Sequence, residues 1–195
     1  DEVYGDCKTD KHIETDLLKP SNPYSATKAA GDMLILAWAR TYKVPYIIVR
    51  PSNNYGIGQC VEKLIPKTCK FIHLGRKIPL HEHGTPVRTW LHAKDTAKAV
   101  TKIIDASIVN EIFNISSNIE QQNIETVTQI LSIYFDGNIP KNLEEYIDFS
   151  VTRIGQDVRY SIDDTKLRSI GWRSEANFQL ELPEIVKYYN KNFIW

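Results

Sequence analysis

The sequence predicts an α/β protein, because patterns typical of helices and of strands alternate along the 195 residues. The clearest pair is an amphipathic helical pattern over residues 23–42, followed at residues 44–50 by an apolar run rich in β-branched residues. Residues 51–58 then read as a loop rich in Pro, Ser, Asn and Gly. A loop at the carboxyl end of a parallel strand is where open α/β sheets bind ligands.

The helix over residues 23–42 has a defined start and one apolar face. Pro23 fits the first helical turn, and Ser21 or Asn22 is suited to cap it. The residues spaced to line one broad face are Ala26, Ala29, Ala30, Met33, Leu34, Ala37 and Trp38. The run at residues 44–50 suits a buried parallel strand.

The remaining elements continue the alternation. In chain order, we expect a helix at 62–73, an extended piece at 78–82, a turn at 83–86, a strand at 88–92 and a helix at 95–106. A strand at 111–116 and a helix at 124–135 follow. Extended segments at 148–153 and 157–161, a short helix at 163–170 that stops at Gly171, and a helix at 180–190 complete the chain.

Composition argues against several classes of function. The 24 basic and 24 acidic residues cancel, so no net charge attracts nucleic acid or anionic lipid. No apolar run is long enough to cross a bilayer, and we expect neither a nucleic-acid nor a membrane partner. Cys7, Cys60 and Cys69 are odd in number and widely spaced, which favours a reducing compartment, the cytoplasm, over a disulfide framework.

Tyr24 and Lys28 form the strongest chemical signal. Residues four apart share one face of a helix, so the Tyr hydroxyl and the Lys ammonium can converge. A phenol has an unperturbed pKa of about 10, and a neighbouring ammonium lowers that pKa by stabilising the phenolate. Such a pair can take a proton from an alcohol while hydride leaves for a nicotinamide. Taken alone, the spacing is equally compatible with a packed Tyr and a solvated Lys.

Asp1 and Glu2 are adjacent carboxylates, followed by an aromatic residue and a glycine. Two carboxylates at the end of a strand repel each other, so one can keep a proton near neutral pH. The pair can then supply an acid and a base side by side. A solvated surface pair is the alternative for these two residues alone.

The histidines do not predict a metal site. His81 and His83 share a face of an extended segment, but no third ligand follows at a supporting spacing. We expect a solvated turn there and no metal.

Several sequence blocks, in this order and at these intervals, carry a family resemblance. The blocks are Asp1-Glu2-Val3-Tyr4-Gly5, Asn22-Pro23-Tyr24-Ser25-Ala26-Thr27-Lys28, Ser52-Asn53-Asn54-Tyr55-Gly56, Glu62-Lys63-Leu64-Ile65-Pro66, Arg88-Thr89-Trp90-Leu91-His92, Phe113-Asn114-Ile115, residues 153–160 and Gly171-Trp172. Together they resemble the dTDP-glucose 4,6-dehydratase family, within the extended short-chain dehydrogenase/reductase superfamily. The resemblance covers essentially the whole chain.

The resemblance implies the C-terminal part of an NAD-binding Rossmann fold, a doubly wound parallel sheet, with a small α+β substrate-binding lobe. Residues 1–75 would be the remainder of the dinucleotide-binding domain and carry the catalytic residues. Residues 76–195 would mainly form the nucleotide-sugar lobe, with residues 88–116 returning to the Rossmann sheet. The glycine-rich segment that cradles the NAD pyrophosphate is absent from this sequence, so we expect these residues alone to hold NAD weakly and to be inactive.

The implied reaction has three steps and retains NAD throughout. Tyr24 would deprotonate the sugar 4-hydroxyl as hydride passes to NAD, while Lys28 lowers the Tyr pKa and holds the nicotinamide ribose. Glu2 would remove the C5 proton and Asp1 would protonate the departing 6-hydroxyl. Hydride would then return to C6 and give a 4-keto-6-deoxy sugar.

The resemblance also assigns binding residues. Pro51 and Ser52 would join Tyr24 and Lys28 at the cofactor. The residues expected at the nucleotide-diphosphate sugar are Asn53 near the diphosphate, Lys63 and Leu64 in the nucleotide channel, Pro79 and His81 near the base, Arg88 and Arg153 on the phosphates, Asn123 near the nucleotide, and Gln156. His81 and Gln156 depart from the aromatic residue and the His of bacterial members, so the choice between dTDP and UDP stays open.

Two other functions remain open on the sequence. A nucleotide-sugar 4-epimerase or decarboxylase would share the Tyr24/Lys28 pair, but Asp1 and Glu2 argue against it because epimerisation needs no elimination acid and base. A degenerate, non-catalytic scaffold subunit is the third reading, and the intact catalytic residues oppose it. Family members usually pair through the helix that carries Tyr24 and the helix before it, so we expect a homodimer at full length.

Overall fold

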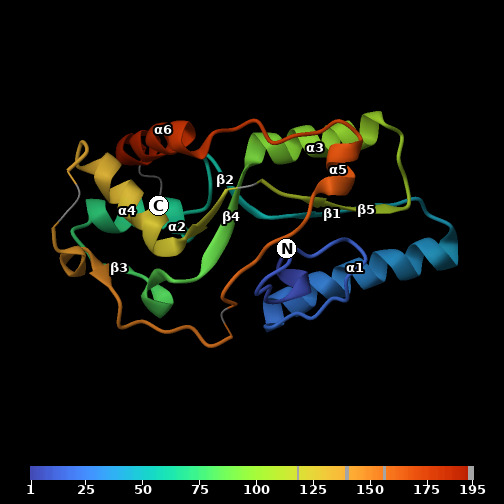
Figure 1. Cartoon of the computed structure of the whole chain (residues 1–195), viewed down its shortest axis with the longest axis horizontal. Coiled ribbons are helices and arrows are strands. Elements are labelled where there is room, and N and C mark those ends of the chain that lie inside the picture. Colours follow the sequence, from blue (N-terminus) through green and yellow to red (C-terminus); the bar gives the residue numbers. More distant parts are fainter. Residues whose placement is uncertain (118, 139–140, 156, 193–195) are drawn as a thin grey trace.

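The computed structural model describes residues 1–117, 119–138, 141–155 and 157–192, and places helices around short parallel strands (Figure 1). The α-helices are α1 (Pro23–Tyr42), α2 (Leu64–His73), α3 (Ala93–Asp105), α4 (Asn123–Tyr134), α5 (Thr165–Ser169) and α6 (Phe178–Lys191). The strands are β1 (Ile47–Pro51), β2 (Asn53–Tyr55), β3 (Ile78–Pro79), β4 (Val87–His92), β5 (Glu111–Ile115), β6 (Glu120–Gln122) and β7 (Ile147–Asp148). Short 3-10 helices cover Glu2–Tyr4, His81–Gly84 and Leu143–Glu145.

Helix α1 begins where the sequence predicts, and Asn22 rather than Ser21 is the cap. The Asn22 side chain accepts a hydrogen bond from the Ser25 backbone N–H at 3.0 Å, and the Asn22 N–H donates to Ser25 Oγ at 3.2 Å. This reciprocal pair satisfies backbone donors that a helix start leaves free. Pro23 occupies the first turn.

The predicted apolar face of α1 is largely exposed within the described residues. Of its seven residues only Ala29 is buried, whereas Leu34 is 62% exposed and Trp38 is 60% exposed. In the described part of the chain, α1 packs chiefly against the 3-10 helix Glu2–Tyr4 at its amino end. Within the described part of the chain, no other helix or strand therefore covers most of the length of α1.

Strands β1 and β5 pair in parallel, with Ile47 opposite Glu111 and Pro51 opposite Ile115. Helix α3 lies on one side of this pair and α1 on the other (Figure 1). The apolar side chains beneath α3 form one core cluster, which comprises Leu91, Ala99, Ile103, Phe113, Ile115, Leu167 and Trp172. The predicted strand at 44–50 begins later than expected, at Ile47.

Strand β4 joins the two ends of the molecule. Its residues 90–92 pair in parallel with β2, and its residues 87–89 pair antiparallel with β6. Neither partner was expected: β2 lies inside the predicted loop at 51–58, and β6 was not predicted. Both strands are only three residues long. Pairing with β4 fixes β6, and pairing with β4 together with the burial of Tyr55 fixes β2.

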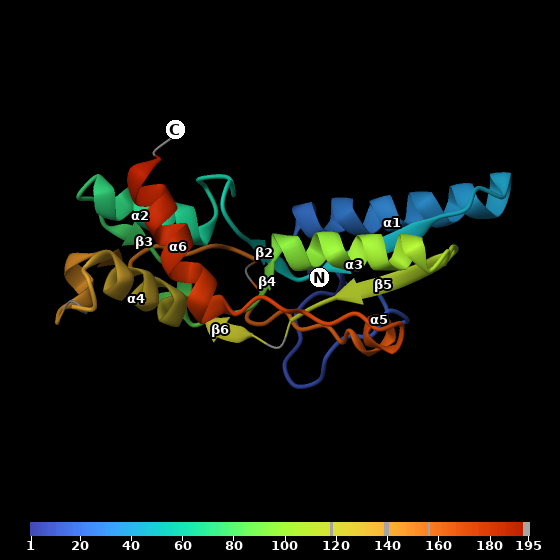
Figure 2. The ribbon, with the colours of Figure 1, turned by 90° about the horizontal axis from the view of Figure 1, so that it is seen from above.

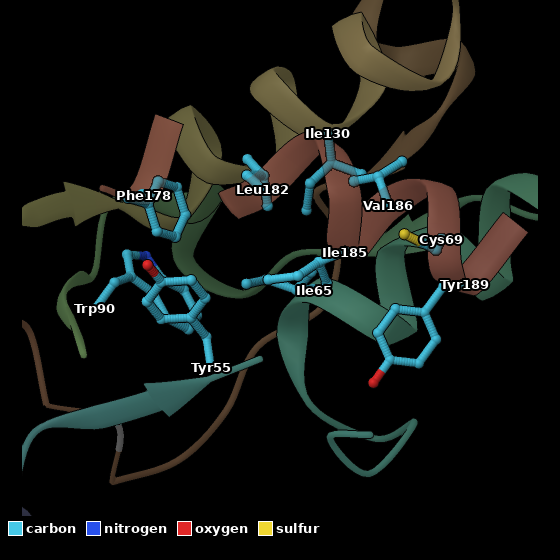
Figure 3. Packing of buried hydrophobic residues seen from close by; sticks show 10 residues of the cluster. All are labelled: Tyr55, Ile65, Cys69, Trp90, Ile130, Phe178, Leu182, Ile185, Val186 and Tyr189. Atoms are coloured by element: carbon cyan, nitrogen blue, oxygen red, sulfur yellow. The ribbon is translucent and has the colours of Figure 1, made fainter. Parts of the chain in front are cut away.

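Helices α2, α4 and α6 pack together beyond β4, as the view from above shows (Figure 2). Their shared core is shown in Figure 3, where Phe178 stacks on Trp90 with ring centroids 5.9 Å apart. Cys69 lies in this core, and burial raises the pKa of its thiol to about 12, as expected of a structural cysteine. Since α2 packs here, residues before 75 contribute to this end of the molecule; the division into two domains stays a prediction.

Replacing Phe178 with Ala in the full-length protein should lower the free energy of unfolding by about 3–5 kcal/mol, because the ring fills a closed aromatic cluster. Leu180, two residues along the same helix, is 73% exposed, so Leu180→Ala should change that free energy by less than about 0.5 kcal/mol. Urea unfolding of both variants measures the difference. Equal effects would show that the cluster is not the core of this part of the molecule.

The helices at the carboxyl end match their expected positions within a few residues, but the extended segments do not. Of residues 148–153 only Asp148 belongs to a strand, β7, which pairs with β3. Residues 157–161 make a single bridge, from Arg159 to Val87, and isolated backbone hydrogen bonds to Val87, Cys7 and His12 hold this segment instead of a continuous ladder. No described helix is long and apolar enough to cross a membrane.

Candidate active site

A cavity of about 650 Å³ opens at the carboxyl end of β1 and gathers the predicted site residues. Those in its lining are Asp1, Glu2, Tyr24, Lys28, Pro51, Ser52, Asn53, Lys63, Leu64, Pro79, His81, Arg88, Asn123 and Arg153. Gln156 lies outside the described residues. Residues that are up to 152 positions apart in sequence, from Asp1 to Arg153, thus share one enclosure. The role of each stays a prediction.

Tyr24 and Lys28 converge as their spacing on α1 predicts. The Lys28 Nζ atom lies 5.6 Å from the centroid of the Tyr24 ring. The Tyr24 side chain is 57% exposed, and it stands in the first turn of the helix that the Asn22 cap fixes. The pair is therefore held at the mouth of the cavity with the phenol open to a ligand.

Asp1 and Glu2 lie at the end of β1. The Asp1 backbone nitrogen donates a hydrogen bond to the Pro51 carbonyl at 3.0 Å, and Glu2 opens the 3-10 helix. The turn that follows needs Gly5, whose φ is 82° and whose missing Cβ would collide with the Lys19 carbonyl oxygen. The carboxylate pair is thus set by backbone contacts on both sides.

Several buried polar atoms in the lining have no partner among the described residues. They are Asp1 Oδ2, Ser52 Oγ, Asn53 Oδ1 and His81 Nδ1. Buried polar atoms in native proteins nearly always have a hydrogen-bond partner, so unsatisfied ones that share a cavity indicate a polar ligand. These four atoms are spread along the cavity, from the Asp1–Glu2 pair at one end to His81 at the other.

The two arginines differ in how freely they could reach an anion. Arg88 stacks on the Tyr160 ring at 4.5 Å and donates to the Val87 and Asp157 carbonyls at 2.7 and 3.2 Å. Burial lowers the pKa of Arg88, and it raises the pKa of Tyr160. A guanidinium has five N–H donors, so donors of Arg88 remain for a ligand. Arg153 is exposed at the rim.

A left-handed turn fixes the far end of the cavity; it overlaps the predicted turn at 83–86 but begins one residue earlier, at Glu82. Glu82, His83 and Gly84 have φ values of 50°, 51° and 76°. A Cβ on Gly84 would lie 2.6 Å from Leu80 Cδ2 and 2.7 Å from Ile124 Cβ. Such strained backbone clusters at functional sites, and here it locks the His81 segment against the start of α4.

Among the lining residues that the sequence did not single out are Asp32, Arg50 and Gln59. Asp32 follows Tyr24 and Lys28 at the same spacing of four on α1, which is a signal that could have found it. Arg50 stands at the end of a predicted strand. Gln59 donates to the Asn54 carbonyl at 2.7 Å and has no sequence signal.

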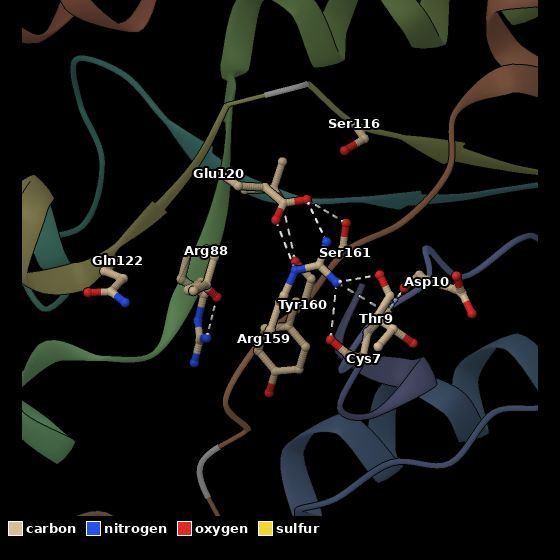
Figure 4. A network of polar contacts seen from close by, with 12 residues as sticks. Cys7, Thr9, Asp10, Arg88, Ser116, Glu120, Gln122, Arg159, Tyr160 and Ser161 are labelled. Atoms are coloured by element: carbon tan, nitrogen blue, oxygen red, sulfur yellow. Dashed lines mark hydrogen bonds and ion pairs between the residues drawn. The ribbon is translucent and has the colours of Figure 1, made fainter.

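A polar network holds the segment around residue 159 beside residues 7–10 (Figure 4). Arg159 forms a bidentate ion pair with Glu120 at 2.9 and 3.0 Å, and its other nitrogen donates to the Cys7 carbonyl at 3.2 Å. Burial by itself raises the pKa of Glu120, but the hydrogen bonds from Arg159 and Ser161 outweigh it and hold that pKa below its usual value.

Because the pKa of Glu120 is lower in the folded protein than in the unfolded chain, its contribution to stability is present above about pH 4.3 and is lost as pH falls through the folded value. Glu120→Gln should therefore destabilise the protein at pH 7, and the difference from wild type should shrink below about pH 4. Urea unfolding of wild type and of Glu120→Gln, at pH values from 7 to below about 4, measures this difference in stability. Glu144→Gln, an exposed control, should follow wild type at each pH. A constant difference for Glu120→Gln would contradict the linkage.

Parallel strands, helices on both sides and a polar cavity at the strand ends define the class: a doubly wound α/β protein of the Rossmann type. The model of the NAD dependent epimerase/dehydratase family matches residues 1–116, and the chain belongs to that family. The predicted fold class and the predicted family resemblance are both confirmed.

The most informative structural relative is a dTDP-glucose 4,6-dehydratase from Bacillus anthracis in complex with NAD. The two chains are 39% identical with a TM-score of 0.88, over 98% of this chain and 60% of that one. A trifunctional UDP-glucose 4,6-dehydratase/UDP-4-keto-6-deoxy-D-glucose 3,5-epimerase/UDP-4-keto-L-rhamnose-reductase from Arabidopsis thaliana is 35% identical over 198 residues, covering 100% of this chain and 29% of that protein.

A UDP-glucuronic acid 4-epimerase from Bacillus cereus has a TM-score of 0.88 but is 19% identical, over 97% of this chain and 59% of that one. That likeness shows a common fold alone.

NAD as the predicted cofactor is confirmed at the level of the family, which is NAD dependent. The residues present fit one end of that cofactor. Ser52 Oγ is buried and unpartnered beside Pro51 at the end of β1, near the Tyr24/Lys28 pair, and offers a hydrogen bond to a polar group there. The 195 residues contain no glycine-rich G-x-G-x-x-G loop for the pyrophosphate.

Proposed function

We propose that the full-length protein dehydrates a nucleotide-activated glucose, dTDP-glucose or UDP-glucose, to the 4-keto-6-deoxy sugar. The observation that carries the proposal is the meeting of two chemical pairs in one cavity: Tyr24/Lys28, suited to alcohol oxidation, and Asp1/Glu2, suited to elimination. The Bacillus anthracis and Arabidopsis thaliana relatives, whose names include a 4,6-dehydratase, support it.

Each pair has a separate task in this proposal. NAD, when bound, takes up the C4 hydride and later returns it to C6. Tyr24 takes the 4-hydroxyl proton, helped by the Lys28 ammonium, which stabilises a phenolate. The new ketone acidifies C5, Glu2 removes the C5 proton, and Asp1 gives a proton to the 6-hydroxyl, which leaves as water. When hydride has been added at C6, the protonated Glu2 returns the proton to C5.

The cavity also supports the proposed binding of a nucleotide diphosphate. Arg88 and Arg153 offer guanidinium donors for phosphate oxygens, while Lys63 adds a positive charge in the lining. Asn53, Leu64 and Asn123 line the path between the sugar end and the Pro79/His81 end, where we place the base. We place Pro51 and Ser52 at the cofactor.

A 4-epimerase is the alternative within the same family. It would use Tyr24 and Lys28 but has no elimination step, so it gives Asp1 and Glu2 no task. Asp1 Oδ2 is buried in the cavity wall and has no partner among the described residues, which favours the dehydratase. A scaffold without activity would not need that buried, unsatisfied oxygen atom, because burying a polar atom without a hydrogen bond costs stability.

The proposal includes a cytoplasmic homodimer. The exposed apolar side chains of α1 offer a surface for a second copy. The cysteines Cys7, Cys60 and Cys69 are all free, which suits a reducing compartment.

Turnover of the full-length protein tests the function. It would be incubated with NAD and either dTDP-glucose or UDP-glucose, and the alkali-induced absorbance of a 4-keto-6-deoxy product would be followed. Product with one nucleotide and not the other supports the dehydratase and identifies the base. A folded, NAD-loaded protein that forms no such product but interconverts C4 epimers would overturn the proposal in favour of the epimerase.

A further inference from the structure

A buried chain of polar contacts links α1, which carries Tyr24 and Lys28, to the 3-10 helix that carries Glu2. Arg50, at the end of β1, donates from Nε to Asp32 Oδ2 at 2.8 Å and from Nη1 to the Tyr4 hydroxyl at 2.6 Å. The Tyr4 hydroxyl in turn donates to Asn114 Oδ1 on β5 at 2.9 Å. Arg50 is 5% exposed, Tyr4 2% and Asn114 0%, so water does not replace these contacts.

The ends of this chain lie next to the proposed catalytic groups. Asp32 follows Lys28 by one helical turn on α1, and both side chains line the cavity. Tyr4 lies two residues after Glu2 in the same 3-10 helix. Any tilt of α1 relative to that short helix would therefore have to break a buried, charge-assisted hydrogen bond.

From this geometry we infer that Asp32, Arg50 and Tyr4 are positioning residues, which hold the elimination pair Asp1/Glu2 in register with the oxidation pair Tyr24/Lys28. This inference rests on the proposed function. None of the three needs to exchange a proton with the substrate. Their effect is geometric: a displacement of about 1 Å between reacting groups can cost about 100-fold in rate.

The Tyr4 hydroxyl is the contact that can be removed most cleanly. Its ring stacks on His12 at 5.1 Å and lies 4.9 Å from the Arg50 guanidinium, and a Phe ring keeps both contacts. In Tyr4→Phe, Arg50 keeps its ion pair with Asp32 and its contact with the Glu14 carbonyl. The variant removes the hydrogen bonds of the Tyr4 hydroxyl to Arg50 and Asn114, so it loosens the link between the 3-10 helix and α1 without leaving Arg50 unpaired.

The test uses full-length, NAD-loaded protein and measures kcat, KM and the near-ultraviolet absorbance of reduced nicotinamide during turnover. If the elimination pair is displaced, oxidation at C4 continues while loss of water slows, so reduced nicotinamide should accumulate. We expect Tyr4→Phe to lower kcat by about 10- to 100-fold with KM within about threefold of wild type. Asp32→Asn, which keeps an oxygen acceptor but removes the charge, should show the same signature more weakly.

Tyr55→Phe is the matched control, because Tyr55 is also a buried tyrosine and its hydroxyl has no partner among the described residues. It should leave kcat and the absorbance unchanged. Folded Tyr4→Phe with wild-type kcat, or with lowered kcat and no reduced nicotinamide, would overturn the inference. If Tyr4→Phe does not fold, the same outcomes in Asp32→Asn decide. Wild-type protein that forms no 4-keto product would instead overturn the proposed function, and this inference with it.

Discussion

Tyr24→Phe is expected to lower kcat by about 10²- to 10⁴-fold, because it removes the group proposed to take the 4-hydroxyl proton. Oxidation at C4 is the first step, so no reduced nicotinamide should appear during turnover. The change keeps the aromatic ring near Lys28 Nζ, and Tyr24 is 57% exposed, so stability should hardly change. Steady-state turnover of the full-length protein, with thermal unfolding as a check, measures both effects.

Tyr42→Phe is the control for this variant, since Tyr42 lies on the same helix and is 63% exposed. It should keep the wild-type kcat. A Tyr24→Phe variant with kcat within about threefold of wild type would rule out the proposed base, because a general base of this kind contributes at least about 10²-fold.

Glu2→Gln is expected to lower kcat by a similar factor, about 10²- to 10⁴-fold, through a different step. The amide cannot take the C5 proton, but the Tyr24/Lys28 pair is intact, so oxidation should proceed and reduced nicotinamide should accumulate. The opposite behaviour of Tyr24→Phe and Glu2→Gln in the same absorbance measurement separates the two proposed tasks.

Glu184→Gln, an exposed carboxylate on α6 away from the cavity, is the matched control and should leave turnover unchanged. If Glu2→Gln lost activity without accumulating reduced nicotinamide, Glu2 would act before or during oxidation. If it kept full activity, the elimination base would have to be another group.

The sequence predicted the helices better than the small strands, for a physical reason. Helix α1 carries its own start signal in the Asn22 side chain and Pro23, both local in sequence. Strands β2 and β6 are three residues each and exist because β4 offers them hydrogen bonds. No local pattern contains that information. The turn predicted at 83–86 was found in nearly the right place, but its left-handed backbone at Glu82 and His83 was not foreseen.

For the site, the sequence blocks indicated which residues lie in the same cavity, but they did not indicate which other residues hold them in place. Asp1, Tyr24, Asn53 and Arg88 belong to separate blocks and line one cavity. Arg50 gave no signal and Asn114 gave one only as part of a family block, because a buried Arg or Asn has the same appearance in sequence as an exposed one. Their partners lie 18 to 110 positions away.

Strand β4 has a consequence for how a substrate can be enclosed. Its amino half pairs with β6, its carboxyl half pairs with β2, and Arg88 and Trp90 on it both line the cavity. Hinge closure needs a flexible joint of a few residues that absorb large changes in φ and ψ. A strand that is hydrogen-bonded on both sides has no such joint. Any closing motion over a bound molecule must then come from loops at the rim, such as the exposed segment around Arg153, while the floor stays rigid.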